Sequence, residues 1–155
     1  MHTLKLNSLA DTKQLAEILA GEISGGTVIM LSGDLGSGKT TFSQFLGKYL
    51  GVKRHMTSPT FNIIKSYNTN ADLKLHHMDC YRLEDSEEDL GFDEYFNDSD
   101  IALVEWPQFI AEFLPEDVIS ININYESENE RFVTIEGTGD SNIKIAEDVY
   151  DKFTS

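Results

Sequence analysis

The chain has 155 residues, a length typical of one domain, and hydrophobic residues make up 40% of it. Its formal net charge of −15 disfavours direct, tight binding of a nucleic-acid backbone. A single cysteine excludes an internal disulfide, and the longest apolar runs are too short to span a bilayer, so we expect one soluble, cytoplasmic domain over residues 1–155.

The first third of the chain alternates strand-like and helix-like segments. Residues 3–6 alternate as a short strand does, and Ser8 or Asp11 can cap a following helix whose apolar positions share one face. Residues 27–32 form a continuous apolar, β-branched run, typical of a strand buried on both faces of a parallel sheet. Apolar residues then recur at helical spacing over residues 39–50, which predicts a second helix.

The rest of the chain predicts mainly strands, followed by a last amphipathic helix. Strands are expected at 61–67, 73–80, 101–104, 118–125 and 132–136, and helices at 108–113 and 142–153. The last two strands alternate as an antiparallel pair. We therefore predict an α/β three-layer sandwich with a mixed, largely parallel central sheet and a C-terminal antiparallel strand pair.

Residues 33–40 read Gly-Asp-Leu-Gly-Ser-Gly-Lys-Thr and match the pattern G-x-x-x-x-G-K-[ST]. Glycines let successive backbone N–H groups face phosphate oxygens, Lys39 supplies charge to the β and γ phosphates, and the Thr40 hydroxyl can ligate Mg²⁺. The predicted helix from Lys39 directs its positive dipole end at the same anion. Because a strand precedes this glycine loop and a helix follows it, we predict a nucleoside-triphosphate site and a P-loop NTPase-like fold.

A dinucleotide-binding fingerprint fits the glycine loop less well. The glycines at 36 and 38 are followed three residues later by Thr41, where that fingerprint requires glycine or alanine.

Two carboxylates lie at the ends of predicted strands and are candidates to hold a hydrated Mg²⁺ or to orient water. Asp79 follows the run 73–78, and Glu105 follows 101–104. A structural cap or salt bridge is the alternative role for each. Strand alternation places His77 beside Asp79 but His76 and Cys80 on the opposite face, which divides a potential zinc ligand set.

Three further features have two interpretations each. Ser58 and Thr60 lie where a nucleotide switch is expected, or they belong to a proline turn before a strand. Trp106 is either a core anchor or an aromatic plate near the nucleotide. The acidic runs 84–89 and 93–100 form either a solvated face or a docking surface for a basic partner.

Four motifs together resemble one family, the small ATPases of bacterial tRNA threonylcarbamoyladenosine biosynthesis called TsaE. They are Gly-Asp-Leu-Gly-Ser-Gly-Lys-Thr-Thr-Phe at 33–42, Ser-Pro-Thr-Phe at 58–61, His-Met-Asp-Cys-Tyr-Arg-Leu at 77–83 and Val-Glu-Trp-Pro at 104–107. They occur in the family's order, and the resemblance covers nearly the whole chain. Cys80 departs from the pattern, because the family more often has an aliphatic residue there.

The resemblance implies a site for ATP and Mg²⁺. ATP would be bound by the loop and by Trp106 and Arg131, the loop residues being Leu35, Gly36, Ser37, Gly38, Lys39, Thr40 and Thr41. Mg²⁺ would be held by Thr40 and Glu105 with Asp79 assisting, and Lys39, Asp79 and Glu105 would act in hydrolysis. It also implies action with two partner proteins, TsaB and TsaD, on the tRNA adenosine next to the anticodon, with tRNA reached only through the complex.

We therefore expect a Mg²⁺-dependent ATPase, monomeric and weakly active alone and stimulated by its partners. A nucleotide-dependent interaction module with little intrinsic hydrolysis is one alternative. A small-molecule kinase is another, although three arginines give little material for the lid that such enzymes close over phosphates.

Overall fold

The computed structural model describes residues 1–34, 37–57, 64–83 and 91–155 of the chain. Its strands and helices follow one another as β1 (His2–Leu6), α1 (Leu9–Glu22), β2 (Val28–Gly33), α2 (Lys39–Tyr49), β3 (Ile64–Asn68), β4 (Lys74–Asp79), η1 (Tyr81–Leu83), η2 (Phe92–Glu94), β5 (Ile101–Glu105), η3 (Pro107–Phe113), β6 (Ile119–Tyr125), β7 (Arg131–Gly137) and α3 (Asp140–Thr154). The short elements η1, η2 and η3 are 3₁₀ helices.

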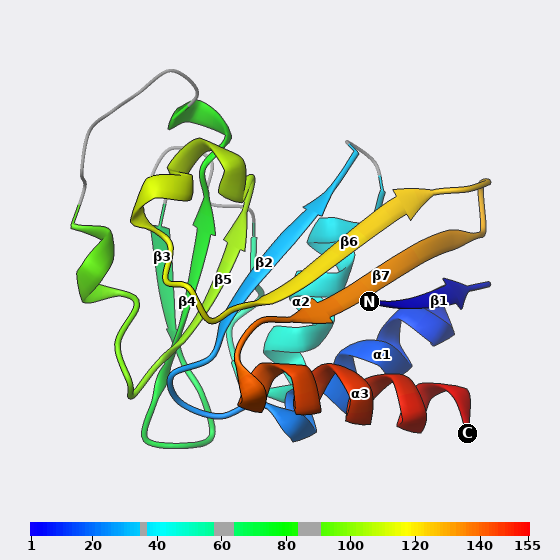
Figure 1. Cartoon of the computed structure of the whole chain (residues 1–155), viewed down its shortest axis with the longest axis horizontal. Helices are drawn as coiled ribbons and strands as arrows, with labels where there is room; N and C mark the ends of the chain where they lie inside the picture. The colour runs from blue at the N-terminus through cyan, green and yellow to red at the C-terminus, as the bar shows by residue number, and fades with distance from the viewer. Residues whose placement is uncertain (35–36, 58–63, 84–90) are drawn as a thin grey trace.

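The strands form one seven-stranded mixed sheet in the order β1-β7-β6-β2-β5-β4-β3 (Figure 1). The four central strands β6, β2, β5 and β4 run parallel to one another, whereas β3 and β7 pair antiparallel to their neighbours. The prediction of a mixed, largely parallel sheet with an antiparallel C-terminal pair is confirmed. Since parallel strands point the same way, the ends of β2, β4 and β5 lie at one edge of the sheet.

Apolar side chains cover both faces of the sheet, as the continuous apolar runs predicted. On β2, Ile29 and Leu31 join the core under α1, α2 and α3, whereas Val28 packs with the opposite core. That second core contains Phe92 and Ile110 from the 3₁₀ segments. The three helices thus form one outer layer and the 3₁₀ segments the other, as Figure 1 shows.

Local differences from the predicted elements have physical causes. Ser8, and not Asp11, caps α1, because its hydroxyl accepts from the Asp11 N–H at 3.4 Å. The helix predicted at 108–113 is a 3₁₀ segment, with non-helical backbone at Ile110 (φ −130°, ψ 27°). Of the strand predicted at 61–67, residues 61–63 lie outside the described part of the chain. None of the described helices is both long and apolar enough to cross a bilayer.

Candidate functional site

The ends of three parallel strands bring the predicted site residues together. Gly33 ends β2, Asp79 ends β4 and Glu105 ends β5. In the sheet Glu105 is the register partner of Asp79 on one side and of Leu31 on the other. Because α2 begins at Lys39, six residues after Gly33, its first turn lies at this same edge.

Two glycines shape the glycine loop. Gly33 has φ +146°, and a Cβ there would lie 2.1 Å from the carbonyl oxygen of Ile123 on neighbouring β6. Gly38 has φ +105° and is the N-cap of α2, with no side-chain cap. No side chain therefore caps the start of α2, the end of a helix that favours an anion, and a Cβ on Gly38 would meet nothing within 4 Å.

Lys39 places a cation inside the loop. Its Nζ donates to the Gly33 carbonyl oxygen at 2.8 Å and lies 4.0 Å from the centre of the Trp106 ring. Burial lowers the pKa of Lys39, an effect opposed by the charges of Glu105, Asp79 and Asp34. The side chain is 7% exposed and has no carboxylate within ion-pair distance among the described residues, so its charge is available to an anionic ligand.

The two carboxylates differ in their surroundings. Glu105 is buried, and its Oε2 lies 2.6 Å from Nε2 of His77 on β4. Asp79 is half-buried and accepts the Tyr81 N–H at 3.1 Å, so it also ties the start of η1. The sequence predicted His77 as a polar neighbour of Asp79, but its hydrogen bond goes to Glu105.

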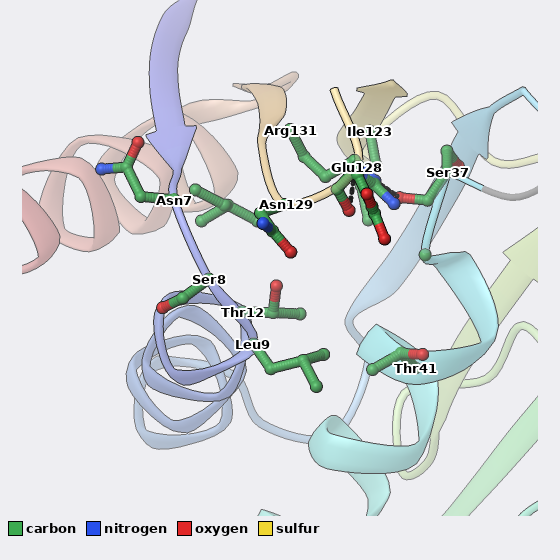
Figure 2. A pocket seen from close by; sticks show the side chains of 12 residues that line it. Asn7, Ser8, Leu9, Thr12, Ser37, Thr41, Ile123, Glu128, Asn129 and Arg131 are labelled. Carbon is green, nitrogen blue, oxygen red and sulfur yellow. Dashed lines mark hydrogen bonds between the residues drawn. The ribbon is translucent and has the colours of Figure 1, made fainter. Parts of the chain in front are cut away.

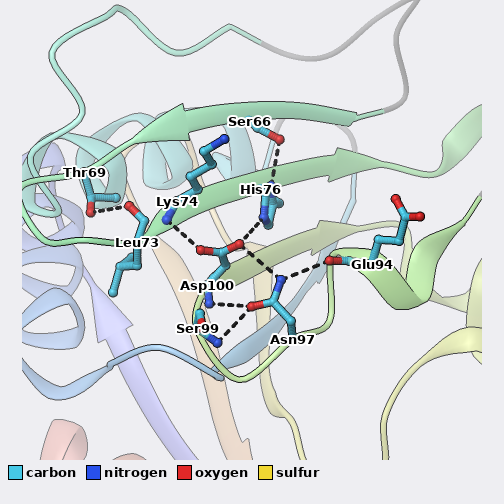
Figure 3. A network of polar contacts seen from close by, with 9 residues as sticks. All are labelled: Ser66, Thr69, Leu73, Lys74, His76, Glu94, Asn97, Ser99 and Asp100. Carbon is cyan, nitrogen blue, oxygen red and sulfur yellow. Dashed lines mark hydrogen bonds and ion pairs between the residues drawn. The ribbon is translucent and has the colours of Figure 1, made fainter.

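The predicted alternation along β4 is confirmed. His76 turns away from the site and bonds Ser66 through Nδ1 at 2.7 Å and Asp100 through Nε2 at 2.9 Å (Figure 3). His76 and His77 therefore belong to two separate polar networks. No group of three or more potential metal ligands of the His, Cys, Asp and Glu types occurs within the described residues.

Trp106 contacts both the second core and Lys39. It packs against the second core, with the Tyr81 ring 4.9 Å away edge-on and the Phe109 ring 6.1 Å away in a stacked orientation, and it also lies under Lys39. Its φ of +55° is the only positive value for a non-glycine residue in the described part of the chain. Such a conformation costs about 1–3 kcal/mol and is typical of functional sites.

A cavity of about 490 Å³ opens beside the glycine loop (Figure 2). Ser8, Leu9 and Thr12 line one wall, facing Ser37 and Thr41 across the space. The hairpin between β6 and β7 contributes Glu128, Asn129 and Arg131. The wall formed by α1 and Asn129 carries no motif, so the sequence did not identify it.

Arg131 attaches this hairpin to the glycine loop. Its Nε donates to the Ser37 carbonyl oxygen at 2.9 Å, and its Nη1 donates to the carbonyl of Glu130 at 2.8 Å. The guanidinium also lies 4.6 Å from the centre of the Tyr125 ring. Arg131, carried over only weakly by the resemblance, thus lies at the cavity and holds one of its walls.

An orphaned polar atom tests whether the loop fits a phosphate group. The Ser37 hydroxyl is fully buried, and no partner for it is found among the described residues. With the open space above Gly38 and the charge of Lys39, this donor fits an oxyanion. The Thr40 hydroxyl and the Glu105 and Asp79 carboxylates are oxygen groups of the kind that Mg²⁺ prefers.

Several predicted site residues lie outside the described part of the chain. These are Leu35 and Gly36 of the glycine loop, the switch candidates Ser58 and Thr60, and the acidic run 84–89.

Comparisons with known proteins agree on one family. The family model for the threonylcarbamoyl adenosine biosynthesis protein TsaE matches residues 6–133. The protein named tRNA threonylcarbamoyladenosine biosynthesis protein TsaE of Bacillus subtilis (strain 168) is 46% identical over 129 residues, 83% of this chain and 81% of that protein. The protein of the same name from Rickettsia felis is 37% identical over 135 residues, 85% and 78% of the two chains.

The fold has a close match among solved structures. The crystal structure of Bacillus subtilis YdiB superposes with a TM-score of 0.82 at 34% sequence identity, covering 97% of this chain and 95% of that one.

Proposed function

The chain belongs to the TsaE family of tRNA threonylcarbamoyladenosine biosynthesis, and from this premise we propose that it is the Mg²⁺-dependent, ATP-hydrolysing subunit of that pathway. It acts in the cytoplasm with the TsaB and TsaD proteins on the tRNA adenosine next to the anticodon, and reaches tRNA only through them. The observation that carries the proposal is the convergence of Lys39, Asp79 and Glu105 at the first turn of α2.

The glycine loop would bind the triphosphate of ATP. Lys39 would exchange its bond to the Gly33 carbonyl for phosphate oxygens, and the Ser37 hydroxyl would gain the partner that it lacks. The start of α2, which no side chain caps, adds the positive end of the helix dipole. A cluster of positive charge and donors of this kind stabilises the charge that develops on the transferred phosphoryl group.

Thr40, Glu105 and Asp79 would hold the metal ion and the attacking water. Mg²⁺, when bound, offsets the negative charge of the phosphate oxygens. The buried Glu105 suits a fixed ligand, because a carboxylate in that position needs a partner to offset its desolvation. Either Asp79 or Glu105 orients the water for in-line attack.

The nucleoside end of ATP would occupy the cavity beside the loop. The cavity volume of about 490 Å³ lies within the range of small-ligand sites, and its wall includes Ser37, Gly38 and Thr41 of the phosphate-binding region. The space is thus continuous with the phosphate site. Trp106, which contacts Lys39 and does not line this cavity, would lie near the phosphates and not the base.

Hydrolysis by the isolated subunit should be slow. Stimulated P-loop enzymes use an arginine to stabilise the transition state. Arg131 is already bonded to several carbonyl groups, among them that of Ser37, and Arg54 packs against Tyr67 on β3. The side chain of Arg82, the third arginine, lies outside the described part of the structure. A partner that supplies a cation would raise the rate.

The proposal is tested by Lys39→Ala, with Lys48→Ala as a matched control on the same helix. Lys48 is exposed in the last turn of α2, far from the loop. We expect Lys39→Ala to weaken ATP binding by more than about tenfold, the loss of a charged hydrogen bond, while Lys48→Ala binds normally. ATP turnover is then measured for the subunit alone and with TsaB, TsaD and tRNA.

The two readouts separate the parts of the proposal. Unchanged ATP affinity in Lys39→Ala would contradict the proposed nucleotide site. If the wild type binds ATP but its ATP turnover is not stimulated by the partners, the nucleotide site would stand and the proposed role in the complex would be contradicted.

A further inference from the structure

The pair formed by His77 and Glu105 is the most buried polar contact of the site. His77 is 1% exposed and Glu105 4% exposed, and they lie on neighbouring parallel strands, β4 and β5. The distance of 2.6 Å between Nε2 and Oε2 is short, as expected for a hydrogen bond to a charged group. This contact is the only hydrogen bond to the Glu105 side chain within the described residues.

His76, the neighbour of His77 in β4, is a structural histidine for comparison. His76 has partners on both ring nitrogens, Ser66 and Asp100. His77 has one, because its Nδ1 is buried and no partner for it is found in the described residues. A buried polar atom without a partner costs free energy. The ring of His77 therefore makes the hydrogen bond to Glu105 at the expense of a partner for its Nδ1.

The direction of the hydrogen bond follows from its acceptor. An ionised carboxylate only accepts, so Nε2–H of His77 donates to Oε2 of Glu105. The Nε2–H group then fixes one carboxylate oxygen, Oε2, and restricts rotation of the side chain. The other oxygen, Oε1, is left for a further ligand.

We infer that His77 is a positioning residue, which holds the Glu105 carboxylate in the orientation that binds Mg²⁺. This inference rests on the proposed function, in which Glu105 is a metal ligand. A hydrogen bond to a metal-binding carboxylate restricts its rotation, so the carboxylate loses less conformational freedom when the metal binds. His77 itself contacts neither the metal nor the nucleotide in this assignment.

The experiment measures Mg²⁺ binding to the ADP complex separately from ADP binding in EDTA. We expect His77→Leu to weaken Mg²⁺ binding by about 10–100-fold, as for other residues that orient metal ligands, with ADP affinity in EDTA unchanged. His77→Gln, whose amide nitrogen can replace Nε2, should recover most of the Mg²⁺ affinity. The matched control His76→Leu, on the opposite face of β4, should lower thermal stability but not Mg²⁺ affinity.

Two further measurements complete the design. If His77→Leu does not fold, His77→Asn takes its place, because the shorter side chain does not reach Glu105. Nitrogen NMR of the wild-type imidazoles gives an answer without any variant: Mg²⁺ added to the ADP complex should shift the Nε2 resonance of His77 and not that of His76. No shift at His77 would overturn the inference.

The outcomes also distinguish this inference from the proposed function. Normal Mg²⁺ affinity in His77→Leu, together with loss of Mg²⁺ binding in Glu105→Gln, would overturn the role of His77 and leave Glu105 as the ligand. Normal Mg²⁺ affinity in Glu105→Gln would show that Glu105 does not bind Mg²⁺, and it would contradict the positioning role of His77 as well.

Discussion

At the scale of single residues, the two glycines of the loop are required for different reasons. Gly33 lies against the backbone of β6, where a Cβ would be 2.1 Å from the Ile123 carbonyl oxygen. Gly38 faces open space, and only its φ of +105° disfavours a side chain. Gly33 is thus a packing requirement of the sheet, whereas the space at Gly38 is where we place the phosphates.

Substitution of the two glycines should therefore separate stability from binding. We expect Gly33→Ala to lower the free energy of unfolding by about 3–5 kcal/mol, since backbone strain and a backbone clash add. Gly38→Ala should cost only about 1–2 kcal/mol, the strain alone, but should weaken ADP binding by more than about tenfold. Urea unfolding and calorimetric titration with ADP measure the two effects, and normal ADP affinity in Gly38→Ala would contradict our placement of the phosphates.

The sequence predicts the identity of the site residues better than their contacts. Asp79 and Glu105 are recognisable because each is a carboxylate at the end of a predicted strand. The partner of His77 is not recognisable from the sequence. Glu105 lies beside it because β4 and β5 are neighbours in the sheet, and no local sequence pattern gives the strand order. Asn129 was missed for a similar reason, since its hairpin reaches the cavity through the fold.

At the scale of elements, a polar network ties the β3–β4 hairpin to the start of β5 (Figure 3). Asp100 accepts from the Lys74 backbone N–H at 2.9 Å, from the Asn97 side chain at 3.1 Å and from His76 at 2.9 Å. These bonds, with that of the Lys74 backbone the strongest, lower the pKa of Asp100 to about 2 from its usual 3.8. Two segments distant in sequence, β4 and the turn before β5, thus depend on one ionised carboxylate.

Asp100 should therefore make the fold sensitive to acid. A carboxyl group whose pKa is lower in the folded than in the unfolded state stabilises the fold at pH values above its unfolded-state pKa. This stabilisation is lost as the pH falls through its folded-state pKa. We expect the melting temperature of the wild type to fall between about pH 4 and pH 2 more steeply than that of Asp100→Asn. Thermal unfolding across this range checks it; parallel curves would show that Asp100 is not responsible.

Element type was predictable for continuous apolar runs and for a helix of three turns, but not for a short helical segment. The apolar runs of β2 and β5 and the helical spacing of α2 gave the correct elements. A helix was predicted at 108–113 from the same kind of spacing, yet these residues belong to a 3₁₀ segment that begins at Pro107. Seven residues do not distinguish the two helix types, and the left-handed backbone of Trp106 before it is set by packing and not by local preference.

At the scale of the whole molecule, negative charge surrounds the site proposed to bind an anion. The chain carries a net charge of −15, and Asp34, Asp79 and Glu105 act on Lys39 itself. Glu128 adds a further carboxylate at the cavity wall. The positive groups in the loop act at contact distance, whereas the repulsion acts over the longer distances at which a nucleotide first approaches.

Salt should consequently accelerate the binding of nucleotide. The screening length falls from about 30 Å at 10 mM salt to about 8 Å at 150 mM, which removes the repulsion between the protein and ADP but leaves contacts inside the loop largely unscreened. We expect the association rate of a fluorescent ADP, measured by stopped flow in EDTA, to rise severalfold over this range, while the dissociation rate changes little. Lys5→Glu, which makes the molecule more negative at β1, should steepen the dependence. An association rate that falls with salt would mean that the field of Lys39 and Arg131 dominates at long range, and that the acidic surface does not control access to the site.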